Sequence, residues 1–318
     1  MKRIVALPFR HQASLVCDEA RQMLLDAGFE IVCNETGARL PREEQKALIK
    51  DAYAIIAGTE TYDRDMLAGC ENLKTIIRFG VGTDNLDLEA MREMGIQVGV
   101  IANYNSVAEF ALILILSAMK SLPLFDAEVR RGGWGRYPMR ELRKKTVGIA
   151  GFGRIGRRLA ELLQGFDVTI LAYDPYLDEA EAEKRNVKAV TFDELLEQSD
   201  VVSLHMPLTE DTYHLMNEKT FAKMKDGAYL VNTARGKLVD EHALAEALMS
   251  GKLSGAGLDV FETEPVTSNE NPLFALKNTV LAPHVSAASF ETNYNGGLIC
   301  AESIIRVASG ERPLYPLV

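Results

Sequence analysis

Cysteine is scarce in this chain of 318 residues, and its four copies stand far apart. Cys17, Cys33, Cys70 and Cys300 form no CxxC pair and have no histidine at the spacing of metal ligands. A chain of this length can bury an ample hydrophobic core and does not need disulfides for its stability. The pattern argues against a disulfide framework, and we expect no metal site.

Basic residues and long apolar runs are also lacking. The 35 Lys and Arg against 45 Asp and Glu give a formal net charge of −10, whereas proteins that bind nucleic acid or anionic membranes carry a basic surface. The longest apolar stretch, residues 110–119, is about half of what a membrane-spanning helix needs. The N-terminal segment becomes polar too soon for a secretory signal. We expect a cytoplasmic protein with no nucleic-acid or membrane partner.

Short apolar runs alternate with helical patterns in two series. Strands are predicted in the first series at residues 4–7, 30–33, 54–57, 75–78 and 97–100, with helices such as 14–26 and 42–51 between them. The second series has strands at 145–150, 167–173, 201–205, 228–232, 255–258 and 279–282. Such alternation predicts parallel sheets with helices on both faces. The fold class is therefore α/β, with two doubly wound domains.

Two further helical patterns lie outside these series. Residues 107–131 are rich in Ala, Leu and Ile, more apolar than a helix that covers one sheet face requires. They form either a helix buried between domains or a dimer surface, and we favour the dimer surface. Residues 289–309 are too short for a domain, so we expect them to return to the N-terminal domain and make it discontinuous.

A glycine-rich turn follows the apolar run Thr146–Ala150 and opens a helix. In the string Gly-Phe-Gly-Arg-Ile-Gly, the first glycine permits a tight turn, the second lets backbone approach a pyrophosphate, and the third allows close helix packing. A helix N-terminus adds free N–H groups and partial positive charge. A GxGxxG string alone is weak, but this context predicts a dinucleotide site. Its expected contacts are Gly151, Gly153, Arg154, Ile155 and Gly156.

Asp174 ends the next predicted strand, 18 positions after Gly156. A carboxylate there can accept hydrogen bonds from ribose hydroxyls and repel a 2′-phosphate. The following Pro175 and Tyr176 offer no cation, so the pattern predicts NAD rather than NADP. The alternative is an aspartate that only caps a turn before Pro175. It does not explain why the acid follows a strand, a glycine-rich turn, a helix and a second strand in that order.

Three polar residues, Arg235, Glu264 and His284, each follow a predicted strand of the second series, and open α/β sheets bind ligands at that edge. A guanidinium can grip a carboxylate with two parallel hydrogen bonds. A histidine can donate a proton near neutral pH, and a nearby carboxylate raises its pKa. The ordinary alternatives are a surface ion pair, a solvated acidic cluster and a structural histidine. Together with the dinucleotide turn, the set favours hydride transfer to a small 2-keto acid.

The chain resembles the D-isomer-specific 2-hydroxyacid dehydrogenase family, in particular its D-3-phosphoglycerate dehydrogenase-like members. The resemblance spans most of the chain in family order, which makes it more specific than any single motif. It rests on residues 78–85 (RFGVGTDN), 105–109 (NSVAE), 151–156 (GFGRIG), 205–209 (HMPLT), 232–236 (NTARG), 259–265 (DVFETEP) and 283–284 (PH).

The resemblance implies a role for each candidate residue. Arg235 would bind the substrate carboxylate and polarise its carbonyl, His284 would be the acid/base, and Glu264 would be its partner. Backbone N–H groups around Val81 and Gly82 would help to hold the carboxylate. The remaining cofactor contacts would be Asp259, at the nicotinamide carboxamide, together with Pro207, Thr212 and Thr233.

The family's architecture implies two Rossmann-like domains. Residues 1–101 and 288–318 would form the substrate domain, and residues 102–287 the NAD-binding domain, with a helical arm at about 107–131 that builds a homodimer. Arg78 and Arg136 are candidates to bind a distal phosphate, if the substrate has one. The chain ends 34 residues after His284, so we expect no appended regulatory domain and no serine feedback.

The sequence therefore predicts an NAD-dependent enzyme that interconverts a D-2-hydroxy acid and its 2-keto acid. A hydroxypyruvate or glyoxylate reductase is the alternative within enzymes, and a catalytically silent NAD(H)-sensing regulator is the alternative from another class. Val285-Ser286-Ala287 departs from the glycine-rich residues that many relatives carry there, so the particular acid stays open. The histidines His11, His205, His214 and His242 are not expected to act in catalysis, and His11, His214 and His242 are expected at the surface.

Overall fold

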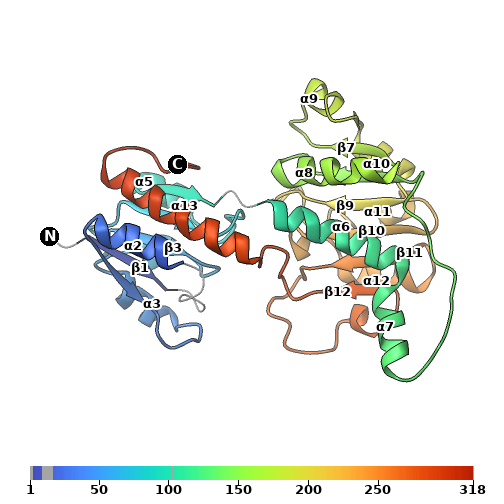
Figure 1. The fold of residues 1–318 in the computed structure, drawn as a ribbon, viewed down its shortest axis with the longest axis horizontal. Coiled ribbons are helices and arrows are strands. Elements are labelled where there is room, and N and C mark those ends of the chain that lie inside the picture. The colour runs from blue at the N-terminus through green and yellow to red at the C-terminus, as the bar shows by residue number, and fades with distance from the viewer. Residues whose placement is uncertain (1–2, 9–16, 102–103, 318) are drawn as a thin grey trace. The chain divides into compact units, whose positions relative to one another are not determined.

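The computed structural model describes residues 3–8, 17–101 and 104–317. It divides the chain into two compact units, one formed by Met1–Asn103 with Ala287–Val318 and the other by Tyr104–Ser286. Each unit is built on one parallel sheet with helices on both faces (Figure 1). The α/β doubly wound class predicted from sequence is confirmed. His11 and the start of the predicted helix at 14–26 lie outside the described residues.

The first unit has a five-stranded sheet in the order β2-β1-β3-β4-β5, and all its ladders are parallel. Each of its strands lies within one residue of its predicted start, because each is a short apolar run bounded by polar or glycine residues. The strands are β1 (Arg3–Leu7), β2 (Phe29–Cys33), β3 (Ala54–Ala57), β4 (Thr75–Arg78) and β5 (Gln97–Val100).

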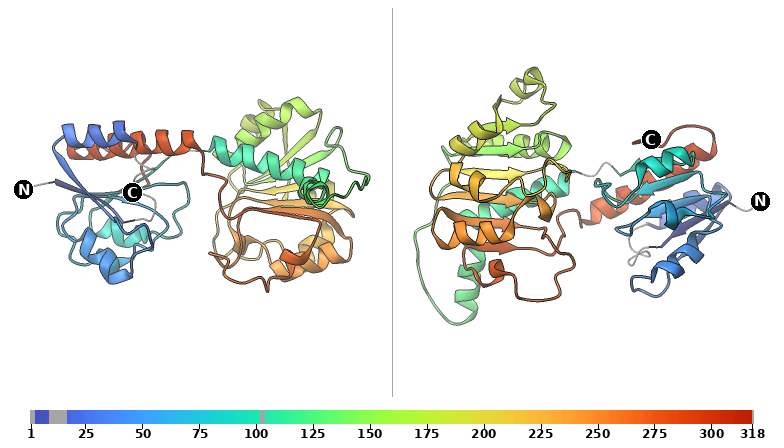
Figure 2. Two further views of the ribbon diagram at one scale, coloured as in Figure 1. Left: turned by 60° about the horizontal axis from the view of Figure 1, so that its bottom comes forward. Right: turned by 180° about the vertical axis from the view of Figure 1, so that it is seen from behind.

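Alternate residues of these strands enter separate apolar clusters on the two faces of the sheet. In β1, Val5 and Leu7 pack with α2 (Asp18–Asp26) and α13 (Phe290–Ala308), whereas Ala6 packs on the opposite face. Figure 2 shows α2 and α13 side by side over the sheet. The helices on the other face are α3 (Arg42–Ile49), α4 (Arg64–Leu67) and α5 (Leu88–Glu93).

The second unit has a seven-stranded parallel sheet in the order β12-β11-β10-β9-β6-β7-β8. The strand order reverses between β6 and β9, the kind of point at which α/β proteins bind ligands. The edge strand β8 is not predicted, because three residues around an exposed lysine carry too little apolar pattern. The strands are β6 (Thr146–Ala150), β7 (Thr169–Tyr173), β8 (Val187–Ala189), β9 (Val201–Leu204), β10 (Ala228–Asn232), β11 (Leu253–Leu258) and β12 (Thr279–Leu281).

Helices cover both faces of this second sheet (Figure 1). Helices α6 (Asn105–Lys120) and α8 (Arg154–Leu163) pack on one face. A Cβ at Gly257 of β11 would lie 2.8 Å from the Cβ of Leu114 in α6, so glycine permits this close packing. The opposite face carries α10 (Phe192–Gln198), α11 (Glu218–Lys223) and α12 (Glu241–Met249), and α9 (Glu179–Glu183) lies beside β8.

The prediction of one helix over residues 107–131 is wrong. The chain breaks at Ser121, whose φ of 49° is left-handed, and a separate helix α7 (Leu122–Arg130) follows with Pro123 in its first turn. Proline fits a first turn because its missing N–H has no partner there in any case. Among the described residues, no single helix is long and apolar enough to cross a membrane. Only α6 and α7 taken together reach that length and composition, with a 64° bend between them.

Candidate active site

Arg235, Glu264 and His284 follow three neighbouring parallel strands, β10, β11 and β12. Because these strands run in the same direction, the residues after them leave the sheet at the same edge. All three residues belong to the second unit. The three polar segments identified from sequence thus lie on one edge of one sheet.

His284 and Glu264 form a close side-chain pair. Nδ1 of His284 lies 2.6 Å from Oε2 of Glu264, and the two side chains are 45% and 32% exposed. An Nδ1–H that donates to this carboxylate leaves Nε2 as the free ring nitrogen.

The surroundings of this pair favour the charged form of each group. The hydrogen bond that His284 donates to Glu264 raises the pKa of His284 above its usual 6.5, against the opposing effects of burial and of the Arg235 charge. Burial alone would raise the pKa of Glu264, but its hydrogen bonds with His284 and the Phe261 amide outweigh burial and lower it. Both shifts favour the charged forms, an imidazolium beside a carboxylate.

The loop that carries His284 is held by Asp259, whose side chain is fully buried. The N–H groups of Val285 and Ser286 donate to Oδ1 and Oδ2 of Asp259 at 2.8 and 2.9 Å. The N–H of His284 donates to the Asp259 carbonyl at 2.8 Å. These bonds hold His284 in a left-handed conformation, with φ at 54°. Sequence reasoning missed this role for Asp259; the only hint was an acid directly after an apolar strand.

The segments that carry Arg235 and Glu264 are packed against each other. A Cβ at Gly236 would lie 1.9 Å from the carbonyl carbon of Phe261, so only glycine allows the two backbones to approach so closely. The N–H of Phe261 donates to Oε1 of Glu264 at 2.9 Å. Buried Asn232 fixes the turn before Gly236, since its amide donates to the Arg235 carbonyl at 2.8 Å. Arg235 and the pair of Glu264 and His284 are thus set on one backbone framework.

The glycine-rich turn after β6 has the geometry of an anion site at the start of α8. Gly151 has a φ of 98°, and a Cβ there would lie 2.5 Å from the carbonyl carbon of His205. A Cβ at Gly156 would lie 2.2 Å from the Gly151 oxygen, which fits close packing of α8 on β6. Among the described residues, nothing lies within 4 Å of the Cβ position at Gly153, and Gly153 gives α8 no side-chain cap. Open space therefore meets the N-terminus of a helix here, as a pyrophosphate requires.

Asp174 links the turn to the end of β7. Its Oδ2 accepts a hydrogen bond from the N–H of Phe152 at 2.8 Å, and its Oδ1 accepts one from Tyr176 at 2.9 Å. The carboxylate thus caps the turn, as the alternative interpretation of the sequence has it. A carboxylate oxygen has a second lone pair, so this capping is compatible with a ribose contact as well.

The other candidate cofactor residues differ in what surrounds them. Thr212 stabilises its own loop by two hydrogen bonds. Its hydroxyl donates to the carbonyl of exposed Pro207 at 2.7 Å and accepts from the Thr209 N–H at 2.7 Å. Thr233 is 6% exposed, and within the described part of the chain its hydroxyl has no hydrogen-bond partner. A buried hydroxyl without a partner costs about 1–3 kcal/mol, so a polar group of a bound molecule fits here. The residues of this unit therefore suit a dinucleotide.

The candidate substrate residues Arg78, Val81 and Gly82 belong to the first unit, after β4. The Arg78 guanidinium donates to the Phe79 carbonyl and, at 3.4 Å, to Oδ1 of Asn85. Val81 is 40% exposed, and Gly82 is half-buried. The loop after β4, which contains Val81 and Gly82, thus lies at the carboxyl edge of the first sheet.

Other reactive side chains lie outside this constellation. All four cysteines are free, and within residues 3–8, 17–101 and 104–317 no group of three or more His, Cys, Asp or Glu side chains is arranged to hold a metal ion. Burial lowers the pKa of His205 to about 4, and its Nε2 lies 2.9 Å from the Ser203 hydroxyl. His205 is therefore neutral near pH 7 and is no source of a proton there.

A parallel α/β unit with a glycine-rich turn at its switch point defines a dinucleotide-binding protein, and comparison with known proteins narrows the class. Residues 112–286 match the family model described as D-isomer specific 2-hydroxyacid dehydrogenase, NAD binding domain. The chain belongs to the D-isomer specific 2-hydroxyacid dehydrogenase family, and its second unit holds the family's NAD-binding domain. The predicted resemblance and the predicted cofactor, NAD, are confirmed.

Named relatives point to two substrate classes. The chain is 39% identical to a D-3-phosphoglycerate dehydrogenase of Archaeoglobus fulgidus over 98% of its own length and 58% of that protein. It is 41% identical to a glyoxylate reductase of Thermofilum pendens over 86% of its length and 83% of that protein. A glyoxylate reductase structure from Paecilomyes thermophila superposes with a TM-score of 0.88 at 30% identity, over 99% of this chain and 98% of that one. The chain spans about half the length of the phosphoglycerate dehydrogenases it matches.

Proposed function

We propose that this protein is an NAD-dependent dehydrogenase that interconverts a D-2-hydroxy acid and its 2-keto acid. The observation that carries the proposal is the pair of His284 and Glu264, 2.6 Å apart at the sheet edge that also carries Arg235. Family membership supports it, since the relatives named above are dehydrogenases and reductases of this kind.

The cofactor would lie along the carboxyl edge of the second sheet. The backbone of Gly151–Gly156, including Arg154 and Ile155, would hold the pyrophosphate, and Asp174 would accept from the ribose hydroxyls. Thr233 would use its unpartnered hydroxyl on the bound molecule, Pro207 and Thr212 would line the site, and Asp259 would face the carboxamide. When bound, NADH supplies the hydride that reduces the carbonyl carbon.

The chain's own residues would handle the acid and the proton. The Arg235 guanidinium would grip the carboxylate and polarise the neighbouring carbonyl. Nε2 of His284 would donate its proton to the carbonyl oxygen during reduction and take it back from the hydroxyl during oxidation. Glu264 would hold Nδ1 and stabilise the imidazolium until the proton is transferred. One hydride and one proton thus convert the keto acid to the hydroxy acid.

The rest of the domain plan follows the family. Residues 1–101 with 288–318 would form the substrate domain, in which backbone N–H groups around Val81 and Gly82 hold the carboxylate and Arg78 reads the far end of the substrate. Residues 102–287 would form the NAD-binding domain. The free cysteines suit the reducing cytoplasm, where we place the protein.

A homodimer is part of the proposal. The helical arm and the segment after it expose several large apolar side chains, and a set of this kind marks a protein interface more often than a free surface. They are Ile113, Leu122, Val129, Trp134, Tyr137 and Met139, all in the second unit. Sedimentation of the protein at micromolar concentration checks the dimer, and a monomeric mass would contradict it.

A glyoxylate or hydroxypyruvate reductase is the second candidate. It is supported by the 41% identity to the glyoxylate reductase of Thermofilum pendens. The two candidates differ at the far end of the substrate, because a phosphate needs a cation whereas glyoxylate has nothing there to bind.

The first experiment mixes the purified protein with NADH and a panel of 2-keto acids and follows the loss of NADH absorbance. The panel contains 3-phosphohydroxypyruvate, hydroxypyruvate, glyoxylate and pyruvate. Fast and selective oxidation with one acid is expected and would identify the substrate class. Tight NADH binding without turnover of any acid would contradict the enzyme and favour an NAD(H)-sensing regulator.

A further inference from the structure

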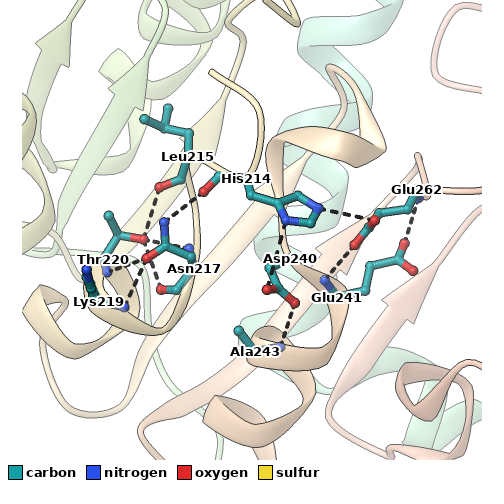
Figure 3. Close-up of polar contacts among 9 residues, drawn as sticks. All are labelled: His214, Leu215, Asn217, Lys219, Thr220, Asp240, Glu241, Ala243 and Glu262. Carbon is teal, nitrogen blue, oxygen red and sulfur yellow. Dashed lines mark hydrogen bonds and ion pairs between the residues drawn. The ribbon is translucent and has the colours of Figure 1, made fainter. Parts of the chain in front are cut away.

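Two glutamates exchange hydrogen bonds between the start of α12 and the loop that carries Glu264 (Figure 3). The N–H of Glu262 donates to Oε1 of Glu241 at 2.8 Å, and the N–H of Glu241 donates to Oε1 of Glu262 at 3.0 Å. The amide of Asn271 donates to Oε2 of Glu241 at 2.6 Å. We call Glu241, Glu262 and Asn271 the carboxylate clasp.

A histidine, His214, lies beside Glu262 of the clasp. From sequence His214 is expected at the surface, but its side chain is only 27% exposed and faces two acids (Figure 3). Its Nε2 lies 3.2 Å from Oε2 of Glu262, and its Nδ1 lies 4.0 Å from Oδ2 of Asp240. Asp240 also caps α12, since its Oδ1 accepts from the N–H of Ala243 at 3.0 Å. Glu262 is therefore bonded to the start of α12 and also lies beside His214, whose Nε2 makes no hydrogen bond within the described residues.

The clasp completes the anchoring of the Glu264 loop. The loop starts at Asp259, which is bonded to the His284 segment, and continues through Phe261, whose backbone packs on Gly236. Glu262 is the last anchored residue before the exposed stretch that carries Glu264. Without the clasp, the segment from Glu262 to Glu264 would keep the bond from the Phe261 amide to Glu264, the pair of Glu264 with His284 and the contact of Glu262 with His214.

The clasp also brings two carboxylates together. Burial raises the pKa of Glu241, and the charge of Glu262 raises it further. Like charges held close together disfavour the fold unless other contacts compensate. The charged groups that face Glu241 are Glu262 and His242, and those that face His284 are Glu264, Asp259 and Arg235.

We propose that Glu241 is a positioning residue: the clasp holds the loop so that Glu264 meets Nδ1 of His284, and thereby sets the pH range in which His284 is protonated. The kinetic consequence rests on the proposed function, whereas the effect on His284 itself does not. When the clasp is broken, Glu264 contacts His284 for less of the time. The His284 titration then moves down toward the value of an isolated histidine.

The test compares Glu241→Ala and Glu241→Gln with a matched control. In the Gln variant, the side-chain oxygen can still accept from the Glu262 N–H. Its NH2 group then faces the NH2 group of Asn271, so two donors meet and that hydrogen bond is lost. Adding Asn271→Asp restores a donor and acceptor pair, and aspartate can still accept from the Leu273 N–H as Asn271 does. The control is Glu194→Gln, because Glu194 likewise accepts from a backbone N–H at a helix start, that of Thr191, the N-cap residue of α10, at 2.8 Å.

The first readout is the pH profile of keto-acid reduction. In Glu241→Ala, we expect the fall of kcat at high pH to begin about half a pH unit or more lower, with the KM for NADH within about twofold of wild type. Glu241→Gln should show a smaller shift, which Asn271→Asp reverses. Glu194→Gln should leave the profile unchanged. A profile that is unchanged in both Glu241 variants, even with a lower melting temperature, would assign Glu241 a structural role only and overturn the inference.

The second readout needs no activity. NMR of the cofactor-free protein follows the ring protons of its five histidines, and the His284→Ala variant identifies the signal of His284. A lower His284 titration in Glu241→Ala supports the positioning role even if the wild type reduces none of the keto acids, in which case only the proposed function fails. An unchanged titration overturns the positioning role even if the wild type is fully active.

Discussion

The glycine-rich turn and the edge after β11 and β12, both in the second unit, are built by opposite means. The turn at Gly151–Gly156 depends on side chains that are absent, since a Cβ at Gly151 or Gly156 would collide with backbone. The edge after β11 and β12 depends on side chains that are present, because Asp259 and Glu241 hold the backbone of the loops that carry His284 and Glu264. Glycine leaves backbone free to meet an anion, whereas a proton donor must be held in one place.

The largest expected effect comes from removing His284, the proposed proton donor. In His284→Ala, kcat should fall about 10²–10⁴-fold, while the Kd for NADH stays near wild type, because the turn is untouched. Steady-state kinetics and fluorescence titration with NADH measure the two quantities. A loss of NADH affinity as large as the loss of rate would show that the two regions are not separate in function.

The pH dependence of the two reaction directions tests the role of the Glu264 and His284 pair. Glu264 raises the pKa of His284 above 6.5, so keto-acid reduction, which needs the imidazolium, should persist past pH 6.5. Above the raised pKa the rate should fall about tenfold per pH unit. Oxidation of the hydroxy acid needs the neutral ring and should show the opposite limb. In Glu264→Gln both limbs should move to lower pH, and limbs that stay in place would separate Glu264 from the proton transfer.

The turn offers a matched pair of substitutions. Gly156→Ala places a Cβ 2.2 Å from the Gly151 oxygen and should cost roughly 1–3 kcal/mol of stability. Gly153→Ala meets nothing within 4 Å, so its thermal unfolding should match wild type. Its methyl group would instead stand where the pyrophosphate approaches, and NADH affinity should fall about tenfold. Equal melting temperatures for the two variants would contradict the packing role of Gly156.

The same contrast explains what could be predicted from sequence. Strand β3 is a continuous apolar run, and glycines at fixed spacing after β6 mark a turn, so local patterns predict both. The break at Ser121 is not predictable in this way, because serine is rarely left-handed. The bonds from Asp259 and Glu241 join segments about 20 residues or more apart and have no period along the chain. The roles of Arg235, Glu264 and His284 in catalysis stay predictions until the variants are measured.

The smallest effect is expected at Thr233, a buried residue after β10 whose side chain we propose to contact the cofactor. Its buried hydroxyl has no partner in the described chain, so Thr233→Val removes a polar group that stabilises nothing in the free protein. The cofactor-free variant should unfold at the same temperature as wild type or slightly above it. Its NADH affinity should fall by about fivefold to tenfold, because one hydrogen bond contributes about 1 kcal/mol. Calorimetry with and without NADH measures both, and a variant that loses stability but keeps its affinity would place the partner of this hydroxyl in the protein.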